Sequence, residues 1–272
     1  RNQPMTRVFK TAAGIAALGS ACFGGGAFAQ DARPKSSSDW SVIVGAAAVV
    51  APVYEGADSY TISPLPFFRV TWKDAVSLDA KGLNVRMIKQ GGFKAGAGLT
   101  YDMGRDEDGD TLLFENQDDS LRGLGDIDPA IGVRAFASYD FSVATVSSSA
   151  VRYFGDDNDG LLIDASLSKR IPVGRRVSLT PSVKMTWADN AYMDTFFGVS
   201  GAQSARSGIA PFSAGPGFKD VSAGLSVAYA FSENWGLMVR GEVKQLLGDA
   251  ADSPISDDDT SASMFTAITY RY

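Results

Sequence analysis

The side chains with the clearest capacity for chemistry are carboxylates that cluster in polar segments between the predicted strands. Residues 105–128 contain nine Asp and Glu against two arginines. Asp106, Asp108 and Asp110 are spaced by single residues and would offer the hard oxygen ligands that calcium prefers. No glutamate stands at the twelfth position that an EF-hand loop requires. The pattern therefore favours a solvated loop shaped by Asp, Asn and Gly turns, and these three residues are weak metal candidates.

Enzymatic chemistry has little support in this composition. Two carboxylates at a defined separation could cleave murein glycans, but the acids lie in loops and no aromatic-lined cleft is visible. The chain has no histidine, which excludes Ser-His-Asp and Cys-His pairs and imidazole metal sites. We therefore expect a protein that is not an enzyme and has no cofactor.

The N-terminal segment resembles an export signal. Arg7 and Lys10 precede a small apolar run at 12–23, and Ala27-Phe28-Ala29 fits a cleavage site. We expect residues 1–29 to be a signal peptide that is removed, and residues 30–272 to form one domain. Lipidation at Cys22 is the alternative, although the leucine expected three residues before it is missing.

Charge and cysteine content exclude further classes. Residues 1–29 hold three bases and no acid, so residues 30–272 have 22 Lys and Arg against 31 Asp and Glu. Nucleic acid is therefore not an expected partner, because phosphate binding needs concentrated positive charge. Cys22 is the single cysteine, so no disulfide framework is expected.

Residues 40–272 alternate between apolar and polar side chains in segments of about 10 to 13 residues, a length that suits tilted strands crossing a bilayer. The alternation is clearest in 177–187, 221–231 and 235–244. It also occurs in 40–51, 62–72, 93–103, 129–139, 141–153, 160–170 and 264–272. The fold class is therefore predicted to be all-β, a transmembrane antiparallel β-barrel.

Loop lengths bear on the strand count. The connections 104–128, 154–159, 188–218 and 248–261 are long and polar, whereas those near 140, 171–175 and 232–234 are short. Outer-membrane barrels place long loops outside the cell and short turns in the periplasm. All long loops share one side if 75–89 is two short strands hinged at Lys81-Gly82. This predicts about twelve strands, with ten as the alternative.

Aromatic residues and the last residues support a membrane wall. All four tryptophans, Trp40, Trp72, Trp187 and Trp235, fall at predicted strand ends, where barrels have aromatic girdles. The chain finishes within an alternating pattern that ends at Tyr272. We read it as the closing strand of the barrel, because closure leaves no open edge.

Charged residues that alternate with the apolar face are predicted to line the lumen. They form either a narrow charge-selective pore or a plugged interior of paired charges, and loop 188–218 would close the interior by folding inward. The predicted lumen-lining residues are Lys94, Arg134, Arg152, Asp164, Arg170, Lys184, Arg240, Glu242 and Lys244.

Several ordered motifs resemble the MipA/OmpV family of MltA-interacting outer-membrane proteins. They are the runs 52–58, 64–66, 121–127, 192–204 and 246–255. One departure is Ala57, where the family more often has serine. The residues that carry the resemblance most directly are Pro52, Tyr54, Glu55, Gly56, Gly198, Val199, Ser253 and Pro254.

This resemblance implies a non-enzymatic scaffold in the outer membrane of a Gram-negative bacterium. Its implied partners are outer-membrane lipid and lipopolysaccharide, a lytic transglycosylase and a penicillin-binding protein, which would link it to murein synthesis and remodelling. The alternatives are a narrow small-solute channel and a surface barrel for adhesion or stress response. Family resemblance does not choose among them, because function depends on sites rather than on folds.

Overall fold

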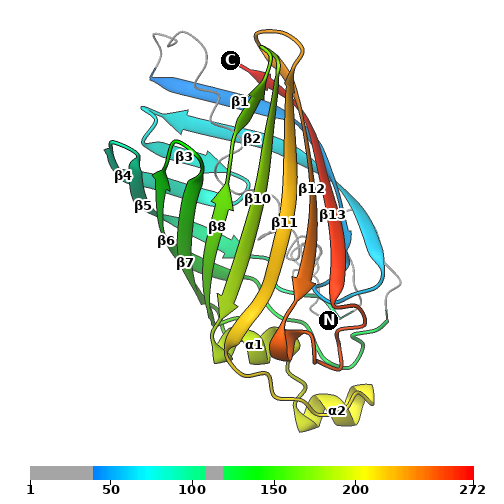
Figure 1. Cartoon of the computed structure of the whole chain (residues 1–272). Helices are drawn as coiled ribbons and strands as arrows, with labels where there is room; N and C mark the ends of the chain where they lie inside the picture. Colours follow the sequence, from blue (N-terminus) through cyan, green and yellow to red (C-terminus); the bar gives the residue numbers. More distant parts are fainter. Residues whose placement is uncertain (1–38, 108–118) are drawn as a thin grey trace, which may run out of the picture.

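The computed structural model describes residues 39–107 and 119–272, and these form a closed antiparallel barrel of twelve strands (Figure 1). The predicted signal peptide, Asp108 and Asp110 lie outside the described residues. The wall strands are β1 (Trp40–Pro52), β2 (Tyr60–Trp72), β3 (Val76–Asp79), β4 (Gly82–Gln90), β5 (Phe93–Asp102), β6 (Ala130–Asp140), β7 (Thr145–Phe154), β8 (Leu161–Ser168), β10 (Val177–Ala188), β11 (Gly217–Ala230), β12 (Trp235–Leu246) and β13 (Thr260–Arg271).

Each wall strand pairs with its neighbours along the chain, and β1 closes the ring by pairing with β13, for example at Val44 and Tyr270. The short β9 (Ile171–Val173) pairs with the start of β10 and continues the line of β8. The predicted barrel and its twelve strands are confirmed, and the alternative of ten is wrong.

The region predicted as two hinged strands is a short hairpin. β3 and β4 pair from Val76 and Val85 up to Asp79 and Gly82, with the turn at Ala80-Lys81. Only four residues of β2, Arg69–Trp72, pair with β3. The hairpin therefore fills the wall only near the periplasmic end of β2.

The long connections gather at one end of the barrel. Helices α1 (Asn190–Phe197) and α2 (Gly201–Ser207) and the 3-10 turn η2 (Gly248–Ala250) lie there, opposite the β11–β12 turn (Figure 1). This is the extracellular end by the loop-length rule. None of the helices in 39–107 and 119–272 is long and apolar enough to cross a membrane.

Apolar side chains on the outer face are exposed along most strands, as hydrocarbon contact requires. Examples are Ile62, Leu99, Ile131, Val183, Leu225 and Ile268. Aromatic pairs mark the periplasmic end: Trp40 and Trp72 face each other across β1 and β2 with ring centroids 6.2 Å apart, and Trp235 lies 5.1 Å from Tyr270. The outer wall is thus apolar with an aromatic rim.

Part of the interior is apolar rather than charged. Side chains of β1, β2, β12 and β13 form a buried cluster that includes Val49, Phe67, Met238 and Phe265, with the rings of Phe67 and Phe265 6.4 Å apart. Two further clusters lie among the extracellular loops. The polar interior is therefore concentrated elsewhere, mainly on β8, β10, β11 and β12.

A proline explains the interruption between β8 and β9. Pro181 of β10 lies between Ser182, which pairs with Ser168, and Leu179, which pairs with Ile171. The Pro181 carbonyl accepts from the Lys169 N–H at 3.2 Å, but Pro181 has no N–H with which to donate a second hydrogen bond across this pair. The ladder breaks at this point because a proline in a sheet interior removes one of its hydrogen bonds.

Two more prolines lie on a strand edge of β2. On the side away from β1, residues Tyr60–Phe68 have no strand partner among the described residues. Lys73 donates to the Asp39 carbonyl across the β1–β2 pair, while the Trp72 carbonyl accepts from Ala75 on the other side. Because peptide groups alternate in direction along a strand, the nitrogens of Pro64 and Pro66 face the unpaired side.

Candidate functional site

A β-bulge places two consecutive charged residues inside the barrel. Thr186 of β10 pairs with Asp220 of β11, and the next pair is Trp187 with Phe218, so Lys219 has no partner on β10. A bulge of this kind re-aims side chains that simple alternation would place on opposite faces. Both Lys219 and Asp220 are buried, with side chains 1% and 0% exposed and Nζ 2.8 Å from the carboxylate.

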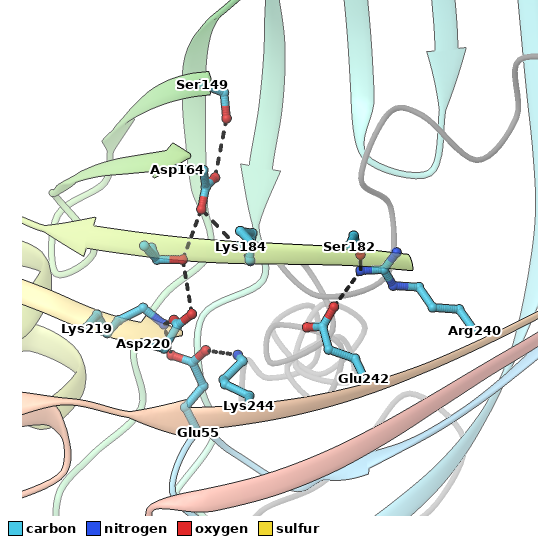
Figure 2. Close-up of polar contacts among 11 residues, drawn as sticks. Glu55, Ser149, Asp164, Ser182, Lys184, Lys219, Asp220, Arg240, Glu242 and Lys244 are labelled. Carbon is cyan, nitrogen blue, oxygen red and sulfur yellow. Dashed lines mark hydrogen bonds and ion pairs between the residues drawn. The ribbon is translucent and has the colours of Figure 1, made fainter. Parts of the chain in front are cut away.

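Glu55, from the first extracellular loop, connects this bulge to β12. One carboxylate oxygen lies 2.5 Å from Lys219 Nζ, and the other lies 2.6 Å from Lys244 Nζ (Figure 2). Burial favours the neutral acid, but the two lysines outweigh it and lower the pKa of Glu55 to about 2. Glu55 is therefore ionised over the whole physiological pH range.

A row of cross-strand pairs extends the network toward β7. Thr186 donates to Asp220 at 3.1 Å, or to Asp164 of β8 at 3.0 Å, and Ser149 of β7 donates to Asp164 at 3.3 Å. Lys184 Nζ lies 3.9 Å from Asp164 (Figure 2). These contacts follow from register, because residues directly opposite each other share a face.

A separate ion pair lies deeper in the barrel, where Arg240 contacts Glu242 at 2.6 Å. Arg240 also donates to Ser226 at 3.2 Å. We call these residues together the buried ion network. Its charges balance, with four acids and four bases: Glu55, Asp164, Asp220, Glu242, Lys184, Lys219, Arg240 and Lys244.

The strand residues of the network lie beneath loop segments 53–59, 119–127, 189–216 and 247–259, which we call the extracellular cap and to which Glu55 belongs. Lys219 Nζ is 5.8 Å from the centre of the Tyr192 ring of α1. Tyr192, Met193 and Phe197 pack against strand-end residues that include Leu162 and Leu246. Burial raises the pKa of Tyr192 well above its ordinary value, so this ring stays neutral.

The residues that carry the family resemblance meet in this cap. Tyr54 donates to Asp257 at 3.0 Å, and the buried Ser253 donates to the Phe197 carbonyl at 2.6 Å. Gly198 caps the C-terminus of α1, and Val199 forms an isolated bridge with Phe212. Pro52 ends β1, and Pro254 follows Ser253 in the last loop. Segments distant in sequence are thus joined at one place.

Gly56 is a tightly packed point of this junction. Its φ is +98°, and a Cβ would lie 2.7 Å from Ser256 Oγ and 2.9 Å from Ser256 Cα. We expect Gly56→Ala to destabilise the cap by about 2 kcal/mol, because alanine is strained at a positive φ and its Cβ would displace the backbone of Ser256. Protease cleavage of the loops should report the change. Gly125→Ala is the matched control, because φ is +85° with open space around it; equal effects would contradict the steric argument.

The other residues predicted for the lumen have varied positions. Asp164, Lys184, Arg240, Glu242 and Lys244 belong to the buried ion network. Arg134 lies opposite the buried Val151. Lys94, near the periplasmic end, lies 3.5 Å from Asp140, and Arg170 lies in the break between β8 and β9.

Arg152 lies on the opposite face to the one predicted. It pairs with Val133, which is 49% exposed on the outer wall. Its guanidinium contacts Asp159 and, at 2.9 Å, Asp189, the N-cap of α1. The cause is that Ser149, Val151 and Tyr153 are the buried residues of β7. Arg152 thus anchors the cap from outside.

The weak metal candidates gain no support from the described part of the chain, in which no group of three or more Asp, Glu, Cys or His could hold a metal ion. Asp106 lies there, whereas Asp108 and Asp110 do not.

Sequence reasoning missed Lys219 and Asp220, the centre of the network. The alternation of β11 would place Lys219 outside, with Val221 and Leu225, and only the bulge turns it inward. It also treated 188–218 as a loop, without the helices α1 and α2 that lie in it. A readable signal was present, because Ser200 and Gln203 form a capping box at the start of α2.

Comparison with known proteins finds relatives in Escherichia coli. The Escherichia coli K12 protein named putative outer membrane protein YiaT is 29% identical over 128 residues, covering 47% of this chain and 51% of that protein. The MltA-interacting protein of the same strain is 24% identical over 137 residues, covering 50% and 53%. The chain thus spans about half the length of the curated relatives it matches.

Among solved structures, the translocator domain of the autotransporter NalP from Neisseria meningitidis aligns over 89% of this chain and 90% of that one, with 11% identity and a TM-score of 0.42. The family described as MltA-interacting protein MipA matches residues 44–272. This match covers all but the first four residues of the twelve-stranded wall, and the chain belongs to that family of outer-membrane barrels.

Proposed function

We propose that this barrel is a non-conducting outer-membrane scaffold for murein remodelling, which holds a lytic transglycosylase and a penicillin-binding protein at its periplasmic end. The observation that carries the proposal is the buried ion network beneath the extracellular cap. Eight charged side chains that could attract ions are instead paired with one another.

Electrostatics favour a structural role for this interior. A selective pore keeps charged groups accessible to the solute, with binding weak enough for release. Here Lys219, Asp220 and Glu242 are almost completely buried, and α1 covers the bulge. The interior thus acts as a rigid plug, and interactions with other molecules are left to the outer surfaces and turns.

The proposed partners derive from the relatives. One relative bears the name MltA-interacting protein, which supports a lytic transglycosylase as a partner class. A scaffold needs no catalytic residues, and this agrees with the absence of histidine. The penicillin-binding protein rests on the family resemblance alone.

Two measurements test the proposal. We expect a tagged copy, extracted from envelopes in mild detergent after crosslinking, to retain a transglycosylase that mass spectrometry identifies. The amount of transglycosylase retained is compared with that retained by a tagged barrel in which Gly and Ser replace the periplasmic turn 232–234. In planar bilayers, the purified protein should show no steady unit conductance. Steady channels without a retained transglycosylase would overturn the scaffold and favour a small-solute channel.

A further inference from the structure

The periplasmic end carries a basic segment that is distinct from the buried ion network. Residues Lys169–Arg176, which we call the basic spur, contain four bases and no acid. Three other bases at this end have acidic partners: Lys73 contacts Asp39, Lys89 contacts Asp74 and Lys94 contacts Asp140. Within the described ranges, no ion pair involves Arg170, Arg175 or Arg176. Positive charge is therefore concentrated on the spur.

The spur projects as a hairpin. β9 pairs with β10 through Val173 and Val177 and through Ile171 and Leu179, and Gly174 makes the turn with φ +67°. All residues from Ile171 to Arg176 are exposed. The break opposite Pro181 separates this hairpin from β8. Arg175 and Arg176 follow Gly174 and lie at the tip of the hairpin.

Apolar surface flanks the tip on both sides. Ile171 and Val173 share the face of Val177 and Leu179 and continue the lipid-facing wall of β10. On one side Val177 pairs with Tyr229, whose ring lies 5.0 Å from that of Phe231. On the other side Lys169 donates at 2.6 Å to Ser142, in the turn that carries the exposed Phe141 and Val143.

We propose that the basic spur binds the phosphate of an anionic phospholipid in the periplasmic leaflet. The aromatic rings on each side lie where barrel girdles meet the headgroups, which sets Arg175 and Arg176 at phosphate depth. Guanidinium groups match phosphate oxygens with two parallel hydrogen bonds. Acyl chains would cover Ile171 and Val173. An acidic protein or murein would leave this apolar face uncovered, and lipid is therefore the occupant that fits.

The test uses purified full-length barrel and two lipids, phosphatidylglycerol and phosphatidylcholine, with bound lipids counted by native mass spectrometry. Wild type should retain phosphatidylglycerol in preference to phosphatidylcholine. Replacing Arg175→Gln and Arg176→Gln together should weaken phosphatidylglycerol binding about 30-fold, equivalent to about 1 kcal/mol per arginine. Arg175→Lys with Arg176→Lys keeps the charge but loses the forked geometry, and should give an intermediate affinity.

The matched control removes the same charge at the other end of the barrel. Arg122→Gln with Arg206→Gln alters two extracellular cap arginines and should leave phosphatidylglycerol binding unchanged. Equal loss in both double variants would overturn the proposal, as would equal wild-type affinity for the two lipids. Retention of soluble murein fragments by the spur, without lipid preference, would also overturn it and indicate a cell-wall contact instead.

Discussion

Replacing Glu55→Ala is expected to lower the free energy of unfolding by about 3 to 5 kcal/mol. The substitution leaves Lys219 and Lys244 buried without the carboxylate that lies 2.5 and 2.6 Å from them, and breaking a buried ion pair from one side costs about this much. Urea unfolding of the barrel in lipid vesicles, followed by tryptophan fluorescence, measures the change.

The control and the pH dependence sharpen this prediction. Asp156→Asn neutralises an exposed loop acid and should change stability by less than about 0.5 kcal/mol.

The pKa of Glu55 is about 2 in the folded protein, below its ordinary value of 4.5. Its contribution is therefore present above about pH 4.5 and is lost as the pH falls toward 2. Wild type and Glu55→Ala should converge over that interval, and a constant difference down to pH 2 would contradict the assignment.

Replacing Lys219→Met should have a loss of similar size, about 3 to 4 kcal/mol. The lysine is 1% exposed and contacts both Glu55 and Asp220, so its removal takes from two buried acids a base that both contact. The same vesicle assay measures the effect.

A second substitution distinguishes lost pairing from lost packing. Adding Asp220→Asn to Lys219→Met removes one orphaned acid and should restore at least about 1 kcal/mol, the coupling expected of residues in direct contact. Lys89→Met is the surface comparison, because its pair with Asp74 is more than half exposed, and it should cost no more than about 1 kcal/mol. Additive losses in the double variant would show that the bulge lysine acts through volume alone.

Much of the wall could be predicted from the sequence because lipid imposes a strict alternation. The segments 177–187 and 235–244 match β10 and β12 closely, and the hinge at Lys81-Gly82 predicted the β3–β4 hairpin. Loop lengths then fixed the direction of every strand. These features depend on local pattern, which a single sequence contains.

The site was harder to predict because it depends on departures from the pattern. A bulge at Lys219 inserts one residue and turns the lysine side chain to the face opposite the one that alternation predicts. The residue types from Phe218 to Val221 do not indicate this bulge. β7 reads Ser-Ser-Ser-Ala-Val before Arg152, with too little contrast between its faces to assign the arginine. Glu55 was marked by resemblance, but its partners lie 164 and 189 residues away, a separation that only the closed ring bridges.

The prolines of β2 have a consequence for crowded membranes. A bare run of peptide donors in hydrocarbon would invite a strand from a neighbouring molecule. Along Tyr60–Phe68, every second backbone nitrogen points toward the unpaired side of β2, and at Pro64 and Pro66 that nitrogen has no hydrogen to donate. We therefore expect Pro64 and Pro66 to weaken strand pairing with a neighbouring molecule along this edge.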